Sequence, residues 1–113
     1  MLEADFVRLK HMLDGANEIV EFTADKNMDD FKSDRKLHLS VVHLLEIIGE
    51  AGSRVSSECK DRYFEIPWKS VVGMRNRLIH GYFDINLDIV WSTVTKDIPP
   101  LINALKKIID DEG

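Results

Sequence analysis

The sequence has a single cysteine, Cys59, among its 113 residues. One cysteine cannot form an internal disulfide, and it has no second thiol for a cysteine-based zinc site. A reducing cytoplasm fits this composition best. No stretch approaches the roughly 20 apolar residues of a membrane span, and the mixed, acidic segment 1–14 lacks the basic flank and apolar block of a signal peptide. We therefore expect neither secretion nor contact with a membrane.

Glycine and proline are also scarce, with six and three residues, while 44% of the chain is hydrophobic and 31% is charged. Such a composition is typical of an ordinary folded globular chain and excludes a disordered or fibrous one. The length predicts one domain, residues 1–113. A core of this size is marginal alone, so a dimer is plausible, and any catalytic site must be small or shared between subunits.

Positive charge is in deficit, because the formal net charge is -5. That argues against an extended nucleic-acid-binding surface, since Lys and Arg neutralise phosphate in most non-specific binding. The charge is uneven, however: segment 54–80 has six basic and three acidic residues, a net charge of +3, which leaves -8 for the rest. This segment is either a local site for one phosphodiester or simply a solvated face with uneven charge.

Apolar residues recur every three or four positions along the chain, which predicts helices. We find no strand-like alternation, no internal repeat and no low-complexity tract. The expected fold is therefore an all-α antiparallel bundle of four to five helices. The first helix carries a buried stripe from Phe6 to Val20 or Phe22. A polar connection over 23–30 follows, with Asp29 and Asp30 as residues that could start the next helix.

The second predicted helix continues to about Ser57, and a polar connection covers 56–67. The third helix begins near Trp68 and closes at Gly81. The fourth is capped by Asp84 or Asn86 and ends where Pro99 and Pro100 break the chain. The last helix covers 101–109. Inside the second helix, Gly49 and Gly52 each cost roughly 1 kcal/mol relative to alanine, so we expect another backbone to approach closely there; an ordinary kink is the alternative.

No metal or cofactor is predicted. The four histidines include no pair at the four-residue spacing that places two ligands on one helical face. Glu46 and Glu50 do share a face, so they could act as paired carboxylates. The stronger interpretation is a solvated stripe or partners for basic residues.

One cluster of chemically active side chains remains, within segment 75–82. Arginine offers a planar fork suited to phosphate oxygens, and histidine can exchange a proton near neutral pH. Near a helix end, exposed carbonyls favour imidazolium by roughly 0.3–1 kcal/mol. The cluster therefore suits phosphodiester cleavage. Its members are Arg75, Asn76, Arg77, His80 and Tyr82.

The spacing alone is not specific, because this composition predicts about 0.2 chance occurrences of Arg-x4-His. In the alternative interpretation, Arg75 forms an ion pair with Glu46 or Glu50. His80 would then be a capping or buried histidine, and Tyr82 an aromatic plug over a helix end.

The chain as a whole resembles the HepT family of HEPN-domain proteins, the toxin half of a bacterial and archaeal toxin–antitoxin pair. The likeness covers nearly the entire sequence, and the set of segments that carry it is highly specific. These segments are His11-Met-Leu-Asp14, Leu45-Glu-Ile-Ile-Gly-Glu-Ala51, Ile66-Pro-Trp68, Gly73-Met-Arg-Asn76, Leu78-Ile-His-Gly-Tyr82, Ile89-Val-Trp91 and Asp97-Ile-Pro99.

The resemblance implies a dimerising HEPN-like helical bundle and a metal-independent endoribonuclease with the motif Arg-x4-His-x-Tyr, here Arg75, His80 and Tyr82. Asn76 and Arg77 would support substrate binding. In the family, two subunits bring their motifs to a shared cleft. That arrangement answers a geometric objection, since Arg75 and His80 lie about 140° apart around one helix and could not easily converge on one phosphate.

The resemblance also implies a partner: a nucleotidyltransferase antitoxin of the MNT type that attaches AMP to Tyr82 in a type VII toxin–antitoxin system. The substrate would be RNA. The main alternative is a non-catalytic helical module that binds a nucleotide, or acts as an adaptor, beside a nucleotidyltransferase.

Overall fold

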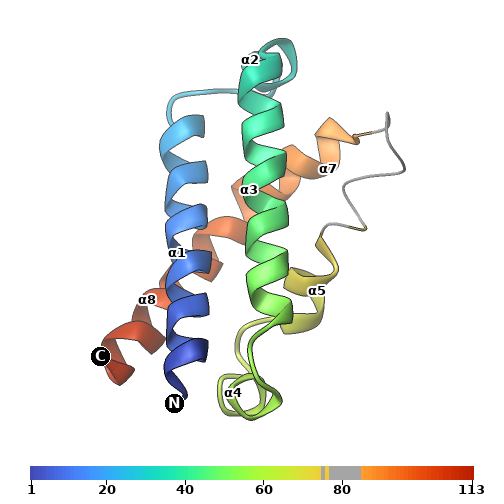
Figure 1. Ribbon diagram of the computed structural model, residues 1–113. Coiled ribbons are helices and arrows are strands. Elements are labelled where there is room, and N and C mark those ends of the chain that lie inside the picture. Colours follow the sequence, from blue (N-terminus) through green and yellow to red (C-terminus); the bar gives the residue numbers. More distant parts are fainter. Residues whose placement is uncertain (75, 77–84) are drawn as a thin grey trace.

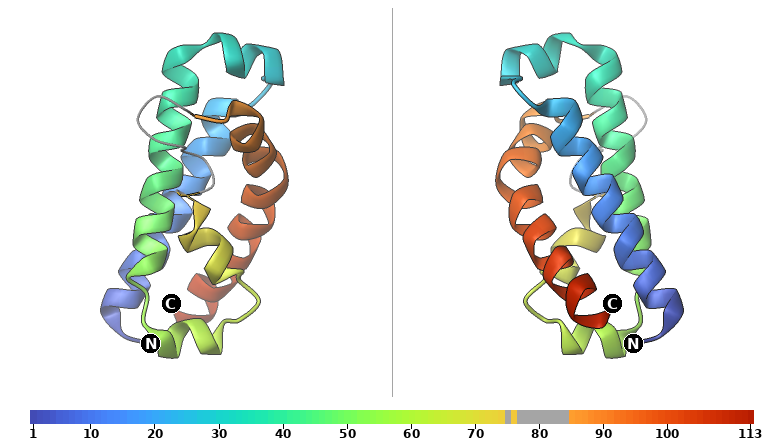
Figure 2. Two further views of the ribbon diagram at one scale, coloured as in Figure 1. Left: turned by 90° about the vertical axis from the view of Figure 1, so that its right-hand side faces the viewer. Right: turned by 90° about the vertical axis from the view of Figure 1, so that its left-hand side faces the viewer.

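Three long helices form the frame of the protein. The computed structural model describes residues 1–74, 76 and 85–113, and the elements in those ranges are helical. The long helices are α1 (Glu3–Thr23), α3 (Arg35–Ser53) and α8 (Ile98–Glu112). Figure 1 shows α1 and α3 side by side, with α8 crossing behind them. In Figure 2, α1 lies between α3 on one side and α8 on the other. The prediction of an all-α bundle is confirmed.

The core is one connected set of apolar side chains shared by the long helices. In α3 the predicted stripe is buried, whereas in α1 the stripe is shifted. Val20 and Phe22 were expected in the core but are exposed, and Met12 and Ile19 are buried instead. The largest fully buried side chains are Leu9, Met12, Ile19, Phe31, Val41, Leu45, Ile48, Ile66, Ile98, Leu105 and Ile108.

The connection between α1 and α3 contains a short helix, α2 (Met28–Ser33), so the predicted second helix is in fact two. Asn27 begins α2: its side-chain oxygen accepts from the Asp30 N–H at 2.8 Å, and the Asp30 carboxylate accepts from the Asn27 N–H at 3.1 Å. This reciprocal pair is a capping box. Asp34 then caps α3 by accepting from the Leu37 N–H at 3.1 Å. The expectation that Asp29 or Asp30 starts one long helix was wrong, because Asp34 ends α2 in an extended conformation.

A second short helix, α4 (Ser57–Arg62), lies where a polar connection was predicted. Ser56 caps it by accepting from the Cys59 N–H at 3.2 Å. Cys59 is its one buried residue, so the sequence carries no apolar period there. α3 accordingly ends at Ser53, earlier than the predicted Ser57, although Val55 remains buried.

The C-terminal part is one helical path rather than two helices separated by a break. α7 (Leu87–Ser92) begins at Asn86, whose side chain accepts from the Ile89 N–H at 3.1 Å, as predicted. A π-helical turn, η1 (Thr93–Asp97), leads directly into α8, and the Ile98 N–H donates to the Thr93 carbonyl five residues back. Pro99 and Pro100 fall in the first turn of α8, where a missing N–H is tolerated. The prediction that they break the chain was therefore wrong.

No helix in the part of the chain that the structure describes is long and apolar enough to cross a membrane.

Candidate functional site

Helix α5 (Trp68–Val72) carries the chain into the predicted motif, and it is firmly attached to the core. It begins directly after Pro67, as expected. The Trp68 indole N–H donates to the Tyr63 carbonyl at 2.9 Å. Val71 and Met74 are each 2% exposed. The backbone that precedes the motif is thus held by buried anchors on both sides of Gly73.

Two glycines of α3 allow α5 to pack directly against that helix (Figure 1). A Cβ atom on Gly49 would lie 3.3 Å from the Val71 carbonyl oxygen, and one on Gly52 would lie 3.2 Å from a Val71 methyl group. The expectation of a close backbone approach at these glycines is confirmed. The motif therefore starts beside the middle of α3.

Of the predicted site residues, the structure describes Asn76. It is helical and exposed, and its N–H donates to the Gly73 carbonyl at 3.1 Å. The other four predicted site residues lie outside the described residues, as do the predicted caps Gly81 and Asp84. Those four are Arg75, Arg77, His80 and Tyr82.

The chain is anchored again soon after the motif. Asn86 caps α7, and the Trp91 ring lies 5.1 Å from the Phe31 ring of α2, centroid to centroid. Lys32 and Asp88 form an ion pair of 2.7 Å between α2 and α7. The segment with the predicted catalytic groups is therefore fixed to the core at both ends, by α5 on α3 and by α7 on α2.

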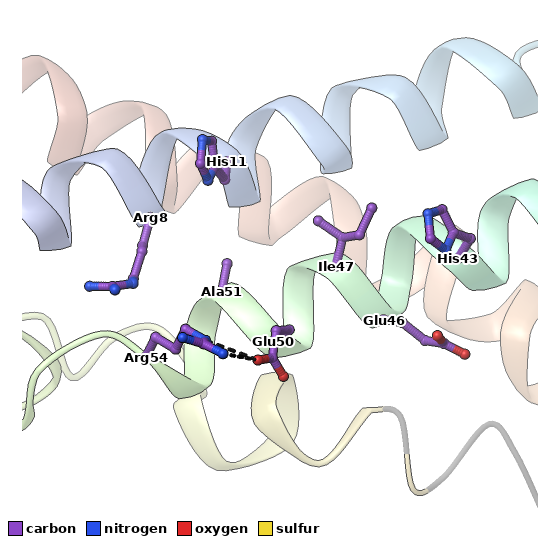
Figure 3. A pocket seen from close by; sticks show the side chains of 8 residues that line it. All are labelled: Arg8, His11, His43, Glu46, Ile47, Glu50, Ala51 and Arg54. Atoms are coloured by element: carbon purple, nitrogen blue, oxygen red, sulfur yellow. Dashed lines mark hydrogen bonds and ion pairs between the residues drawn. The ribbon is translucent and has the colours of Figure 1, made fainter.

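A groove of about 450 Å³ runs along the outer side of α1 and α3 (Figure 3). Arg8 and His11 come from α1, whereas the other lining residues come from α3 and its C-terminal end. Arg54 points its Nε and Nη2 atoms at one carboxylate oxygen of Glu50, each at 2.9 Å. The lining residues are Arg8, His11, His43, Glu46, Ile47, Glu50, Ala51 and Arg54.

The groove decides between the two interpretations of the acidic pair for one member. Glu50 is a partner of a basic residue rather than half of a carboxylate pair. Glu46 is half-buried and has no hydrogen-bond or ion-pair partner within the described ranges. In Figure 3 it lies on the edge of α3 along which α5 runs. Nowhere in the described part of the chain do three potential metal ligands gather.

Sequence reasoning missed this groove. His11 and His43 were considered only as possible ligands on one helix, and Arg8 was not considered at all. A signal existed, because all three lie off the buried stripes of their helices. It could be used only with the pairing of α1 and α3 in hand, which a single sequence does not supply.

The sequence model of the HepT-like family, described as "Ribonuclease HepT-like", matches residues 12–108. The chain belongs to the HepT-like ribonuclease family. The match includes α3, α5, the predicted motif and α7, so the anchored segment described above lies within the region that defines HepT-like proteins.

Curated relatives of this HepT-like chain agree with that assignment. The "Probable ribonuclease HepT" of Thermococcus cleftensis is 37% identical over 100 residues, which cover 88% of this chain and 91% of the relative. A protein of Caldanaerobacter subterraneus subsp. tengcongensis, named as a candidate RNase, is 38% identical over 104 residues, covering 92% and 93%. A similarly named protein of Methanocaldococcus jannaschii is 36% identical over 103 residues, covering 91% and 85%. No solved structure matches the chain significantly.

Proposed function

We propose that this HepT-like protein is a metal-independent endoribonuclease that acts in the cytoplasm as the toxin of a type VII toxin–antitoxin pair. The observation that carries the proposal is the family match over residues 12–108, which includes Arg75 and His80. The anchoring of α5 and α7 supports it, since catalytic side chains need rigid neighbours to hold a productive geometry.

In the proposed reaction, a His80 imidazole accepts the proton of a ribose 2′-hydroxyl. The 2′-oxygen then attacks the adjacent phosphorus, and the bond to the 5′-oxygen of the next nucleotide breaks. That 5′-oxygen takes a proton from a second imidazole, or from the same one later. Acid–base assistance of this kind is commonly worth roughly 10²- to 10⁴-fold in rate. The products are a 2′,3′-cyclic phosphate and a 5′-hydroxyl, and DNA is not a substrate because it lacks the attacking group.

Arg75 would hold the non-bridging phosphate oxygens and stabilise the charge that grows on them in the transition state. Charge-assisted hydrogen bonds are worth roughly 1.5–3 kcal/mol. Asn76 is exposed beside Arg75 and is available to orient it or the RNA, with Arg77 as a further phosphate contact. Because Arg75 and His80 lie about 140° apart around one helix, the active form would be a homodimer with motifs from two chains at one cleft.

Control of the toxin would act through Tyr82. A cognate nucleotidyltransferase antitoxin of the MNT type would transfer AMP to its phenolic oxygen. The added phosphates would repel RNA and compete with it for Arg75.

The test is cleavage of end-labelled single-stranded RNA by the purified protein in EDTA. We expect cutting with cyclic phosphate ends, and loss of cutting in both His80→Ala and Arg75→Ala. Arg35→Ala is the matched control: Arg35 is exposed in the first turn of α3, far from the motif in sequence, so cutting should persist. Circular dichroism checks that each variant is folded. A folded wild type that leaves RNA intact would instead favour the nucleotide-binding or adaptor module.

A further inference from the structure

Half of the large apolar side chains that the described residues leave exposed lie on one surface, the outer side of α1 and α3. Ile47 lines the groove there, and Val7 lines a smaller hollow next to it that shares Arg8 and His11. Leu39 precedes Ile47 by eight residues and Phe22 follows His11 by eleven, spacings that return to the same side of a helix. We call this surface the α1–α3 face, defined by the groove residues together with Val7, Asp14, Glu18, Phe22 and Leu39.

Charge on the α1–α3 face is divided between its two ends. Arg8 and Arg54 lie at one end, because α1 and α3 run in opposite directions (Figure 3). Glu18 lies ten residues beyond Arg8, or about 15 Å along α1, and Glu46 lies eight residues before Arg54, or about 12 Å along α3. Within the described ranges, Arg8, Glu18 and Glu46 have no ion-pair partner.

This pattern does not suit RNA. The two arginines are outnumbered by Asp14, Glu18, Glu46 and Glu50, and one arginine is already paired with Glu50. Binding of a phosphate backbone depends on an excess of positive charge, which this face does not have. The exposed apolar side chains and the mixed charges favour a protein partner.

The pattern does suit a second copy of the same chain. Two identical faces that meet through a two-fold axis must be complementary to themselves. An axis that lies in the plane of the face and runs across the helices places α1 against α1 and α3 against α3, in opposite directions. The basic end of each copy then meets the acidic end of the other, and the axis passes between Ile47 and Arg54.

We infer that two copies pair through the α1–α3 face, with Arg8 of one copy against Glu18 of the other and Arg54 against Glu46. Two helices about 30 Å long and 10 Å wide offer roughly 600 Å², comparable with the roughly 800 Å² per partner of a specific interface. The inference rests on the proposed function in one respect: it places the seam of the shared cleft. Glu46 lies on the α5 edge of the face, so the seam runs beside the segment that leads into the motif.

The first test measures mass by light scattering during gel filtration, from 1 to 100 µM protein. The expected wild-type mass is that of two chains. Ile47→Asp introduces a charge near the axis and should weaken the dimer at least tenfold. Phe64→Asp is the matched control, because Phe64 is 81% exposed and lies outside the face, so its dimer should be unchanged. Both residues are exposed, and circular dichroism should show both variants folded.

The second test reverses charges. Arg8→Glu and Glu18→Arg should each weaken the dimer about tenfold, because each places like charges together across the axis. The double variant restores opposite charges at both symmetric contacts and should recover to within about threefold of the wild type. Failure of this rescue would refute the pairing of Arg8 with Glu18.

Neither test needs RNA cleavage, so the two proposals can fail separately. A wild type that cuts RNA as a monomer would overturn the α1–α3 pairing and leave the ribonuclease proposal intact. A dimer that survives both Ile47→Asp and Arg8→Glu would assign the interface to another surface. If Arg8→Glu weakened binding of a 2′-O-methyl RNA oligonucleotide with no change in mass, the face would be an RNA surface and the inference would be wrong.

Discussion

The α1–α3 face and the surroundings of α4 are both rich in charged side chains, but they differ in how those charges are satisfied. Around α4, the Asp5 carboxylate is 3% exposed and accepts from the Ser56 N–H at 2.9 Å and from the Ser56 hydroxyl at 2.6 Å. The Tyr63 hydroxyl donates to Glu112, and Arg62 lies 3.4 Å from the same carboxylate. We call these residues, with Cys59, the α4 cluster.

On the α1–α3 face, by contrast, Arg8, Glu18 and Glu46 have no partner among the described residues. Charge that is paired inside the chain serves stability, because it ties α1, α4 and α8 together. Charge left unpaired in an ordered arrangement beside apolar side chains is better explained by a partner outside the chain. Substitutions in the two regions should therefore separate folding from association.

The largest effect on stability is expected for Asp5→Ala. It removes the acceptor of two buried hydrogen bonds and should lower the free energy of unfolding by about 2–4 kcal/mol. Asp5→Asn keeps one acceptor oxygen and should fall between that variant and the wild type. The measurement is urea unfolding followed by circular dichroism. Asp14→Ala on the α1–α3 face is the control, with an expected change below about 0.5 kcal/mol; equal losses in the two variants would remove the contrast between the regions.

The next effect is expected at Gly49, which links the face to the motif. Gly49→Val places branched carbon where the Val71 carbonyl approaches, so α5 must move, at a cost of about 1–3 kcal/mol. RNA cleavage per folded molecule should fall as well, because α5 leads into the motif. Ser40→Val, at an exposed position of the same helix, reports the cost of a branched residue alone. Unchanged cleavage in folded Gly49→Val would show that the motif does not depend on this contact.

The α4 cluster also predicts a pH dependence. The hydrogen bond to Glu112 raises the pKa of Tyr63, and the same bond lowers the pKa of Glu112. The stabilisation is present when Glu112 is ionised and Tyr63 is neutral. It is lost as the pH falls through the lowered pKa of Glu112, and again as the pH rises through the raised pKa of Tyr63.

Tyr63→Phe removes this bond, so the excess in Tm of the wild type over the variant should be largest between about pH 5 and pH 9 and narrow on both sides. Burial also raises the pKa of the Cys59 thiol, which adds to the alkaline loss in both proteins and cancels in the comparison. Thermal unfolding in a series of buffers measures the difference. A constant difference from pH 3 to pH 11 would contradict the assignment.

The smallest effect is expected for Glu50→Gln on the α1–α3 face. The pair with Arg54 is exposed and lies within one helix, so its loss should change the free energy of unfolding by about 0.3–0.5 kcal/mol. The effect should disappear in 0.5 M salt. It is measured at low protein concentration, where dimerisation contributes little; a loss above 1 kcal/mol would mean that this face also stabilises the single chain.

Sequence reasoning succeeded where an element repeats a signal over several turns. The long helices α1 and α3 and the contact at Gly49 follow from apolar spacing and from the cost of glycine in a helix. It failed where an element has one or two turns. α2 depends on the Asn27 capping box and α4 on the Ser56 cap, and neither buries enough apolar side chains to produce a period.

The candidate site divides in a similar way. The roles of Arg75 and His80 come from a resemblance over the whole chain, since their spacing alone occurs by chance. Asn76 stayed a supporting candidate and is exposed, as a substrate contact requires. The groove could not be predicted, because Arg8 and Ile47 come together only when two distant helices pack against each other.

The π-helical turn η1 makes the end of the chain sensitive to its length. A π turn accommodates one residue more than an α-helical turn, and each residue of an α-helix corresponds to about 100° of rotation. Deleting any one residue between Thr93 and Asp97 would let the ordinary helical repeat continue into α8. Every side chain downstream would then rotate by about a quarter turn or more, carrying Leu101 and Leu105 away from α1. Evolution can therefore change the identity of these five residues far more easily than their number.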